Sequence, residues 1–148
     1  MPAHKGGLNF TRIIGIIGTV PVIQKILYRR YIMKEHIASC VQIAIEPNNI
    51  KANIDKVCHW MKKAAKEYEA ELIVFPETIT TGFTPNMPAD EFYELLAPVP
   101  GDHTAPIQKL AKELGVHVVY PLYERGKIKR EVLNSSLLID DSGDILGN

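Results

Sequence analysis

The sequence predicts an α/β fold in which parallel strands alternate with helices. Three short apolar runs, at 37–45, 72–75 and 116–123, are typical of strands inside a sheet, and the second has no polar interruption, as in a strand covered on both faces. Two segments between them, 50–68 and 104–114, have apolar residues every three or four positions, the period of an amphipathic helix. A strand, a helix and a second strand in this order predict a crossover between parallel strands.

The first strand is expected to end at a proline, and Asn48 or Asn49 to cap the helix that follows. Cys40 lies inside this strand, where we expect a small buried hydrophobe and not a nucleophile. The second cysteine, Cys58, lies on the helix. Because neither has a metal-ligand or C-x-x-C spacing, no disulfide framework is expected and a reducing compartment is the default.

The strand at 72–75 is followed directly by a proline and a glutamate. Pro76 cannot donate to a sheet ladder, so the strand ends there, and Glu77 brings a carboxylate to the carboxyl end of a buried strand, where open α/β sheets bind ligands. Glu77 is therefore the first candidate for chemistry; the alternative is an exposed turn glutamate without a function. The long connection that follows, with a short helix near 90–96, begins at Phe83, which either lines a substrate pocket or plugs the core.

The rest of the chain predicts a second crossover helix and further strands. Thr104 and Pro106 are typical of a helix start, and Gly115 of a helix end. The segments expected after it are a strand at 116–123, a turn at 124–127, a strand at 132–140 and a new strand from 145 onward.

The composition is that of one ordinary globular domain, with 148 residues, 46% hydrophobic and 23% charged. Residues 1–34 hold six of the 17 Lys/Arg and no Asp/Glu, so residues 35–148 are acidic and no nucleic-acid partner is expected. No glycine-rich nucleotide motif is present. His36, His103 and His117 have no metal-ligand spacing, so neither a metal nor another cofactor is expected.

Residues 1–32 are interpreted as a basic and apolar leader outside the native domain, which would then occupy residues 33–148. Glycines and a proline interrupt the apolar run 13–23, which is roughly half the ~20 residues of a membrane helix, so no membrane span is expected. An organellar targeting peptide and an extra helix stay open as alternatives. Otherwise a cytoplasmic protein is expected.

Four segments, in this order, resemble the amino-terminal part of the nitrilase or carbon-nitrogen hydrolase family: VQIAIEPNNIKANIDKV, ELIVFPETITTGF, PGDHTAPIQKLAKELGVHVVYPLYERG and LNSSLLIDDSGDILGN. The resemblance covers residues 36–148 and is nearest to the amidase and N-carbamoyl amide hydrolase branch. It implies a partial αββα sandwich, truncated within the sheet. It also implies hydrolysis of a carbon–nitrogen bond in a small-molecule amide, carbamoyl or nitrile substrate.

The family's mechanism uses a Glu, a Lys and a Cys: a thiolate attacks the substrate carbon, a carboxylate takes the thiol proton, and an ammonium group stabilises the oxyanion. By motif, Glu77 matches the general base. The Lys and the nucleophilic Cys of the family pattern are absent from this sequence, so the chain alone is expected to be inactive. Phe83 and Glu124 are expected at the substrate, although Glu124 has the alternative of an ion pair with Arg125 or Arg130. Asn134 is expected to fix backbone.

Two functional classes stay open. One is a carbon-nitrogen hydrolase active as the intact protein; the other is a catalytically silent fragment, a pseudoenzyme or interaction module that pairs with a full-length relative. A partial sandwich is expected to expose a sheet face and strand edges. A homo-oligomer is expected as well, since the resemblance implies dimers of stacked sandwiches.

Overall fold

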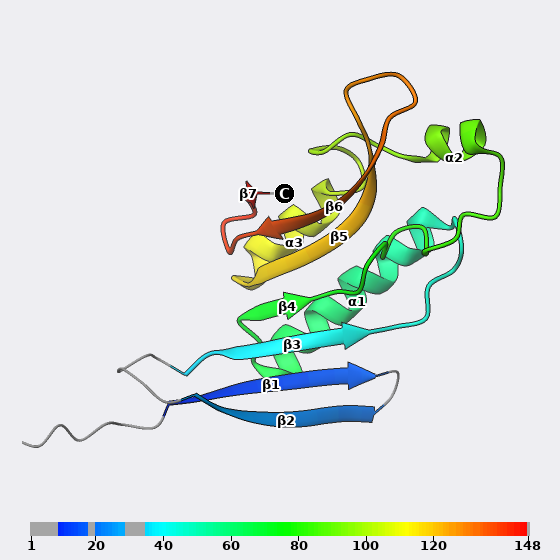
Figure 1. Cartoon of the computed structure of the whole chain (residues 1–148). Helices are drawn as coiled ribbons and strands as arrows, with labels where there is room; N and C mark the ends of the chain where they lie inside the picture. The colour runs from blue at the N-terminus through cyan, green and yellow to red at the C-terminus, as the bar shows by residue number, and fades with distance from the viewer. Residues whose placement is uncertain (1–8, 18–19, 29–34, 148) are drawn as a thin grey trace, which may run out of the picture.

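The computed structural model describes residues 9–17, 20–28 and 35–147, which form one seven-stranded sheet with helices (Figure 1). The strand order across the sheet is β2-β1-β3-β4-β5-β6-β7. The strands are β1 (Asn9–Ile17), β2 (Val20–Tyr28), β3 (Ile37–Gln42), β4 (Leu72–Val74), β5 (His117–Arg125), β6 (Val132–Ile139) and β7 (Ile145–Gly147). The helices are α1 (Ile50–Tyr68), α2 (Ala89–Leu95) and α3 (Ala105–Leu114).

The predicted α/β fold with parallel strands is confirmed. β3 pairs with β4 and β4 with β5, both in parallel, and the chain crosses between them through α1 and then through the segment that contains α2 and α3. Figure 1 shows α1 and α3 on the same face of the sheet, where they also contact each other. β6 and β7 then extend the sheet in antiparallel fashion.

Local signals at the helix ends act as the sequence predicts. Asn49, and not Asn48, caps α1: its side chain accepts a hydrogen bond from the Ala52 amide at 3.2 Å. α3 ends at Gly115, whose φ of 65° is the left-handed conformation that glycine adopts without strain. The buried stripes of the two helices build the core against the sheet, with Ile54, Val57, Met61 and Ala64 on α1 and Ile107, Leu110 and Ala111 on α3.

The two long helices, α1 and α3, cover one face of the sheet (Figure 1). Burial alternates along β5, where the side chains that face the helices are Val118, Tyr120, Leu122 and Glu124. In β4, Ile73 is fully buried while Leu72 and Val74 are half-buried. The expectation that residues 72–75 are covered on both faces is therefore met only in part by the described residues, because Leu72 and Val74, on the face opposite Ile73, keep part of their surface exposed.

The same alternation corrects the prediction for Cys40. Its neighbours Ser39 and Val41 are buried, while Cys40 is exposed on the uncovered face of β3. The predicted strand boundaries also differ: β3 ends at Gln42, and β5 continues through Arg125 because that residue still pairs with β6. Residues 124 and 125 therefore belong to the strand and not to the turn.

Part of the segment interpreted as a leader is folded as two strands. β1 pairs with β2 in antiparallel and with β3 in parallel fashion. The alternative of an extra helix is wrong for residues 9–17 and 20–28, whereas the assignment of residues 1–32 to a leader outside the native domain stays a prediction. Among the residues that the structure describes, no helix has both the length and the apolar character needed to cross a membrane.

Candidate active site

Glu77 begins a tight turn just after β4. The amide of Gly82 donates to the carbonyl oxygen of Thr78 at 2.8 Å, and Thr78 itself has a φ of 53°. The rest of the turn points inward, since its buried side chains are Thr78, Ile79, Thr80 and Thr81. Because these four side chains are buried, the turn presents the exposed carboxylate of Glu77 on a fixed backbone.

Two other elements hold this turn in place. The side chain of Asn53, on α1, donates to the carbonyl oxygens of Glu46 at 2.7 Å and of Thr80 at 2.8 Å, and accepts from the Glu46 amide at 2.9 Å. From the other side, the amide of Ile79 donates to the carbonyl oxygen of Pro121 in β5 at 3.1 Å. The backbone that carries Glu77 is thus tied to α1 and to the neighbouring strand.

The Glu77 carboxylate receives a direct hydrogen bond from β6. Asn134 Nδ2 donates to Glu77 Oε1 at 2.7 Å. The two residues line a pocket of about 340 Å³ together with Pro121, Ser135 and Ser136. Within the described part of the chain, no hydrogen bond involves Oε2, so this oxygen can accept a proton from a group placed in the pocket.

Glu124 lies on the other face of the same hairpin. It is 4% exposed, faces the helices, and accepts a hydrogen bond from the Ser135 hydroxyl. Asn134 and Ser135 are successive residues of a strand, so their side chains point to opposite faces, one to Glu77 and the other to Glu124. Glu124 is not among the residues that line the Glu77 pocket. A substrate contact by Glu124 stays a prediction.

The two arginines weighed as partners of Glu124 form ion pairs with other residues. Arg125 pairs with Glu94, and Arg130 with Asp90. Phe83 is 70% exposed and is also outside the lining of the Glu77 pocket. Neither Phe83 nor Glu124 thus lies with Glu77 in its pocket. Asn134 does contact the Glu77 carboxylate, although the sequence suggested it only as a residue that fixes backbone.

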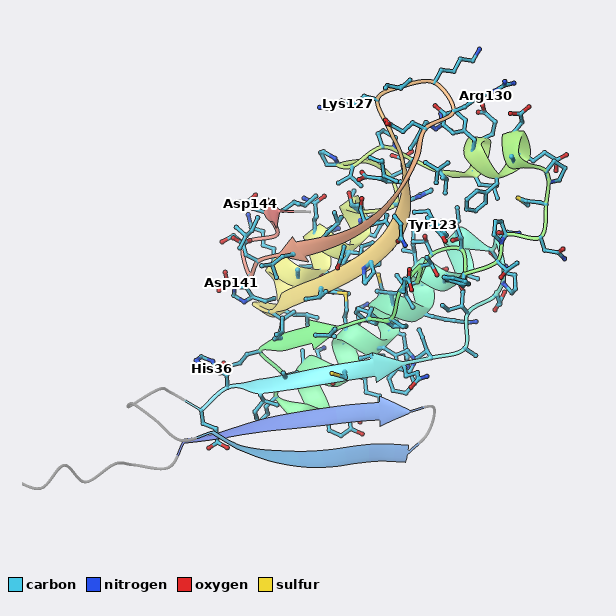
Figure 2. The ribbon with its side chains drawn as sticks, in the orientation of Figure 1. His36, Tyr123, Lys127, Arg130, Asp141 and Asp144 are labelled. Carbon is cyan, nitrogen blue, oxygen red and sulfur yellow. The ribbon has the colours of Figure 1, made fainter. Side chains whose placement is uncertain are left out.

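The thiols and ammonium groups of the described residues lie elsewhere. Neither a lysine nor a cysteine lines the Glu77 pocket among these residues. Cys58 is on α1, where burial raises the pKa of its thiol. Figure 2 shows Lys127 on the hairpin that joins β5 to β6, beyond the end of the sheet. Over the described ranges, no three His, Cys, Asp or Glu side chains come together as metal ligands.

This fold and this turn match a known family. The family model for carbon-nitrogen hydrolases matches residues 37–148, and the chain belongs to this family. A formamidase of Bacillus cereus (strain Q1) is 31% identical over 115 residues, which are 74% of this chain and 34% of the formamidase. The chain thus spans about a third of that relative's length.

Solved structures show the same nitrilase-like fold. An amidase from Nesterenkonia sp. has a TM-score of 0.61 at 20% identity, over 74% of this chain and 40% of the amidase. The NitFhit protein of C. elegans has a TM-score of 0.63 at 13% identity, over 95% of this chain and 27% of NitFhit. In a variant of the Nesterenkonia amidase, the acetamide moiety of fluoroacetamide is added covalently at the active site cysteine.

Proposed function

We propose that the intact protein hydrolyses a non-peptide carbon–nitrogen bond in a small amide, carbamoyl or nitrile compound, with Glu77 as the general base. The observation that carries this proposal is the position of the Glu77 carboxylate. It lies three residues after the end of the parallel strand β4, lines a pocket, and has one oxygen held by Asn134 at 2.7 Å. Family membership and the similarity to a formamidase support the reaction class.

In the proposed reaction with an amide, Glu77 takes the proton of a cysteine thiol, and the thiolate attacks the carbonyl carbon. The new carbon–sulfur bond gives a tetrahedral intermediate. When this intermediate collapses, the carbon–nitrogen bond breaks and the proton held by Glu77 passes to the leaving amine. Glu77 then takes a proton from water, whose oxygen attacks the thioester carbon. The carbon–sulfur bond breaks, the acid is released, and the proton on Glu77 returns to the sulfur to restore the thiol. A lysine ammonium group stabilises the negative oxygen of each tetrahedral intermediate.

The cysteine and the lysine of this scheme come from outside the described residues that line the pocket. The Nesterenkonia amidase, with its covalent adduct at a cysteine, supports a thiol as the nucleophile. For Asn134 we propose a positioning role: by donating to Oε1 it keeps the carboxylate aimed into the pocket and leaves Oε2 for the proton.

A second candidate is a catalytically silent chain that pairs with a second copy or with a full-length relative. It is favoured by the absence of a cysteine and a lysine from the described lining of the Glu77 pocket. The sheet face opposite α1 and α3, on which Cys40 is exposed, supplies a surface for such pairing, and homo-oligomer formation belongs to this proposal.

Mass measurement of the natural gene product, followed by amide and carbamoyl hydrolysis assays, tests the two candidates. If the product is active, Glu77→Gln is expected to lower kcat by about 10²–10⁴-fold, since a positioned base contributes that much. Glu113→Gln, at an exposed position on α3, is the matched control and should keep full activity. A Glu77→Gln variant as active as the control would contradict the assignment of Glu77. An inactive natural product would favour the silent chain.

A further inference from the structure

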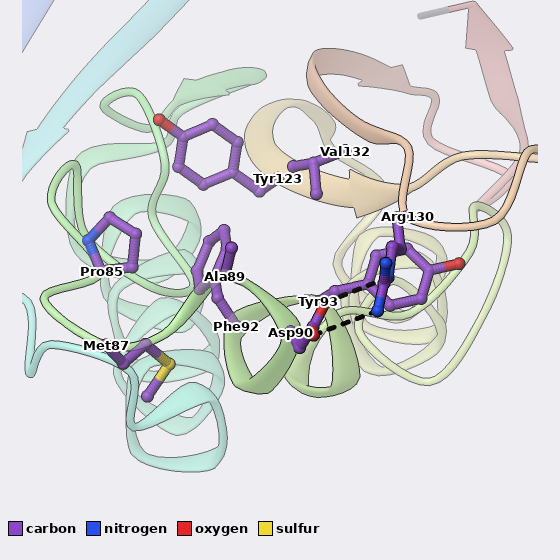
Figure 3. A pocket seen from close by; sticks show the side chains of 9 residues that line it. All are labelled: Pro85, Met87, Ala89, Asp90, Phe92, Tyr93, Tyr123, Arg130 and Val132. Atoms are coloured by element: carbon purple, nitrogen blue, oxygen red, sulfur yellow. Dashed lines mark hydrogen bonds and ion pairs between the residues drawn. The ribbon is translucent and has the colours of Figure 1, made fainter.

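A second pocket lies beside the Glu77 site. Its volume is about 420 Å³, in the range of pockets that bind small molecules (Figure 3). It is formed by the connection after Glu77, by α2, and by β5 with β6. Its apolar wall consists of Pro85, Met87, Phe92, Tyr93, Tyr123 and Val132.

Aromatic packing holds the wall of this pocket in place. Phe92 of α2 is 7% exposed and meets Tyr123 of β5 edge to face, with ring centroids 5.6 Å apart. Arg125 donates from Nη2 to the carbonyl oxygens of Tyr93 and Glu94, at 3.2 and 3.1 Å, and its guanidinium lies 4.8 Å from the Tyr93 ring centroid. These contacts fix the carboxyl end of α2 on β5, so the pocket is largely preformed.

The strand register places this pocket next to Glu77. Tyr123 is paired with Asn134 across β5 and β6, and Asn134 donates to the Glu77 carboxylate. Val132 lies two residues before Asn134, so it is on the same face of β6. A small molecule with its reacting carbon at Glu77 can therefore extend a substituent along this face into the second pocket.

The charges at this pocket neutralise each other. Arg130 Nε and Nη2 lie 3.1 and 3.2 Å from the two carboxylate oxygens of Asp90, and Figure 3 shows the pair away from the rings of Phe92 and Tyr123. Since both charges are already paired, the pocket offers an uncharged group mainly aromatic and aliphatic surface.

From this geometry we infer that the second pocket binds an apolar, ring-sized substituent of the substrate, so that the preferred substrates are small amides that carry an aryl or bulky alkyl group. The inference rests on the proposed function for the amide part of the ligand. The pocket itself is defined by residues that take no part in the proposed chemistry.

Binding of two probes to the 148-residue chain tests the inference. Phenylacetamide should shift the NMR signals of the Met87 methyl group and of the Phe92 and Tyr123 rings saturably. Acetamide, which lacks the ring, should bind roughly tenfold or more weakly. Val132→Phe places a ring in the pocket and should weaken phenylacetamide binding by a similar factor. Ile128→Phe, at an exposed position on the hairpin outside the lining, is the matched control and should bind like the wild type.

Equal binding of the two amides, or equal binding by the Val132→Phe and Ile128→Phe variants, would overturn the inference. A dispersed amide spectrum is the check that each variant is folded before its binding is compared. Two outcomes distinguish failure of this inference from failure of the proposed function. If phenylacetamide binds in the pocket but the natural gene product hydrolyses no amide, carbamoyl or nitrile compound, the pocket inference stands and the proposed function fails. If the natural gene product hydrolyses both amides with the same kcat/KM, the proposed function stands and the pocket inference fails.

Discussion

The strongest structural prediction concerns Asn53, which connects the turn of Glu77 to α1. This side chain is 1% exposed and makes three hydrogen bonds to main-chain groups of Glu46 and Thr80. Each such bond contributes about 1 kcal/mol net, and a buried main-chain group left without a partner costs more. Asn53→Ala should therefore lower the free energy of unfolding by about 3 kcal/mol.

The assay is urea unfolding of the 148-residue chain at pH 7, followed by circular dichroism. Asn49→Ala is the matched control, because Asn49 is an exposed asparagine that caps the same helix through one main-chain amide; its other hydrogen bond, to the Glu46 carboxylate, is also exposed. Loss of such a cap costs about 1 kcal/mol. If Asn53→Ala destabilised the protein no more than Asn49→Ala, the reasoning that α1 holds the Glu77 turn through this side chain would be refuted.

Three further predictions concern a glycine pair, the two thiols and a histidine. Gly143→Ala should lower the free energy of unfolding more than Gly115→Ala. Both glycines have positive φ, but a Cβ at Gly143 would lie 2.5 Å from a carbonyl oxygen of α3, whereas a Cβ at Gly115 would have nothing within 4 Å. Equal urea midpoints of the two variants would contradict this close approach. In thiol labelling at pH 8, Cys40 should react faster than Cys58, because Cys40 is exposed and burial raises the pKa of Cys58. A fast labelling phase that remains in the Cys40→Ser variant would refute the assignment of that phase to Cys40. Burial lowers the pKa of His103, so the unfolded chain takes up a proton at higher pH than the folded chain. The contribution of neutral His103 to the free energy of unfolding is therefore fully present above about pH 6.5 and should be lost as the pH falls below that value. His103→Gln should reduce this fall in urea midpoints between pH 7 and pH 5, and a pH dependence identical to that of the wild type would argue against it.

The parts of the fold that the sequence predicts well are those with local signals. The cap at Asn49, the buried stripe of α1 and the end of α3 at Gly115 each depend on residues within a few positions of one another. The position of Glu77 is predicted for the same reason, since a proline directly before it ends a short apolar strand.

The features that the sequence does not predict depend on residues distant in the chain. The exposure of Cys40 follows from which sheet face carries helices, and no property of β3 itself reveals this. The extension of β5 to Arg125 requires a partner strand at a defined register. The contact between Asn134 and Glu77 joins residues 57 positions apart. Its only local sign is a group of polar residues, Asn134 to Ser136, in an otherwise apolar strand.

The back-to-back placement of Asn134 and Ser135 restricts how this part of the gene can change in length. Inserting or deleting one codon within β6 before these residues would turn Asn134 toward the helices and Ser135 toward the Glu77 side, exchanging the partners of two carboxylates at once. Residues 126–131 lie outside the ladder between β5 and β6 and can absorb added residues without this exchange. Length differences among relatives are therefore expected in that loop and not in the strand beside it.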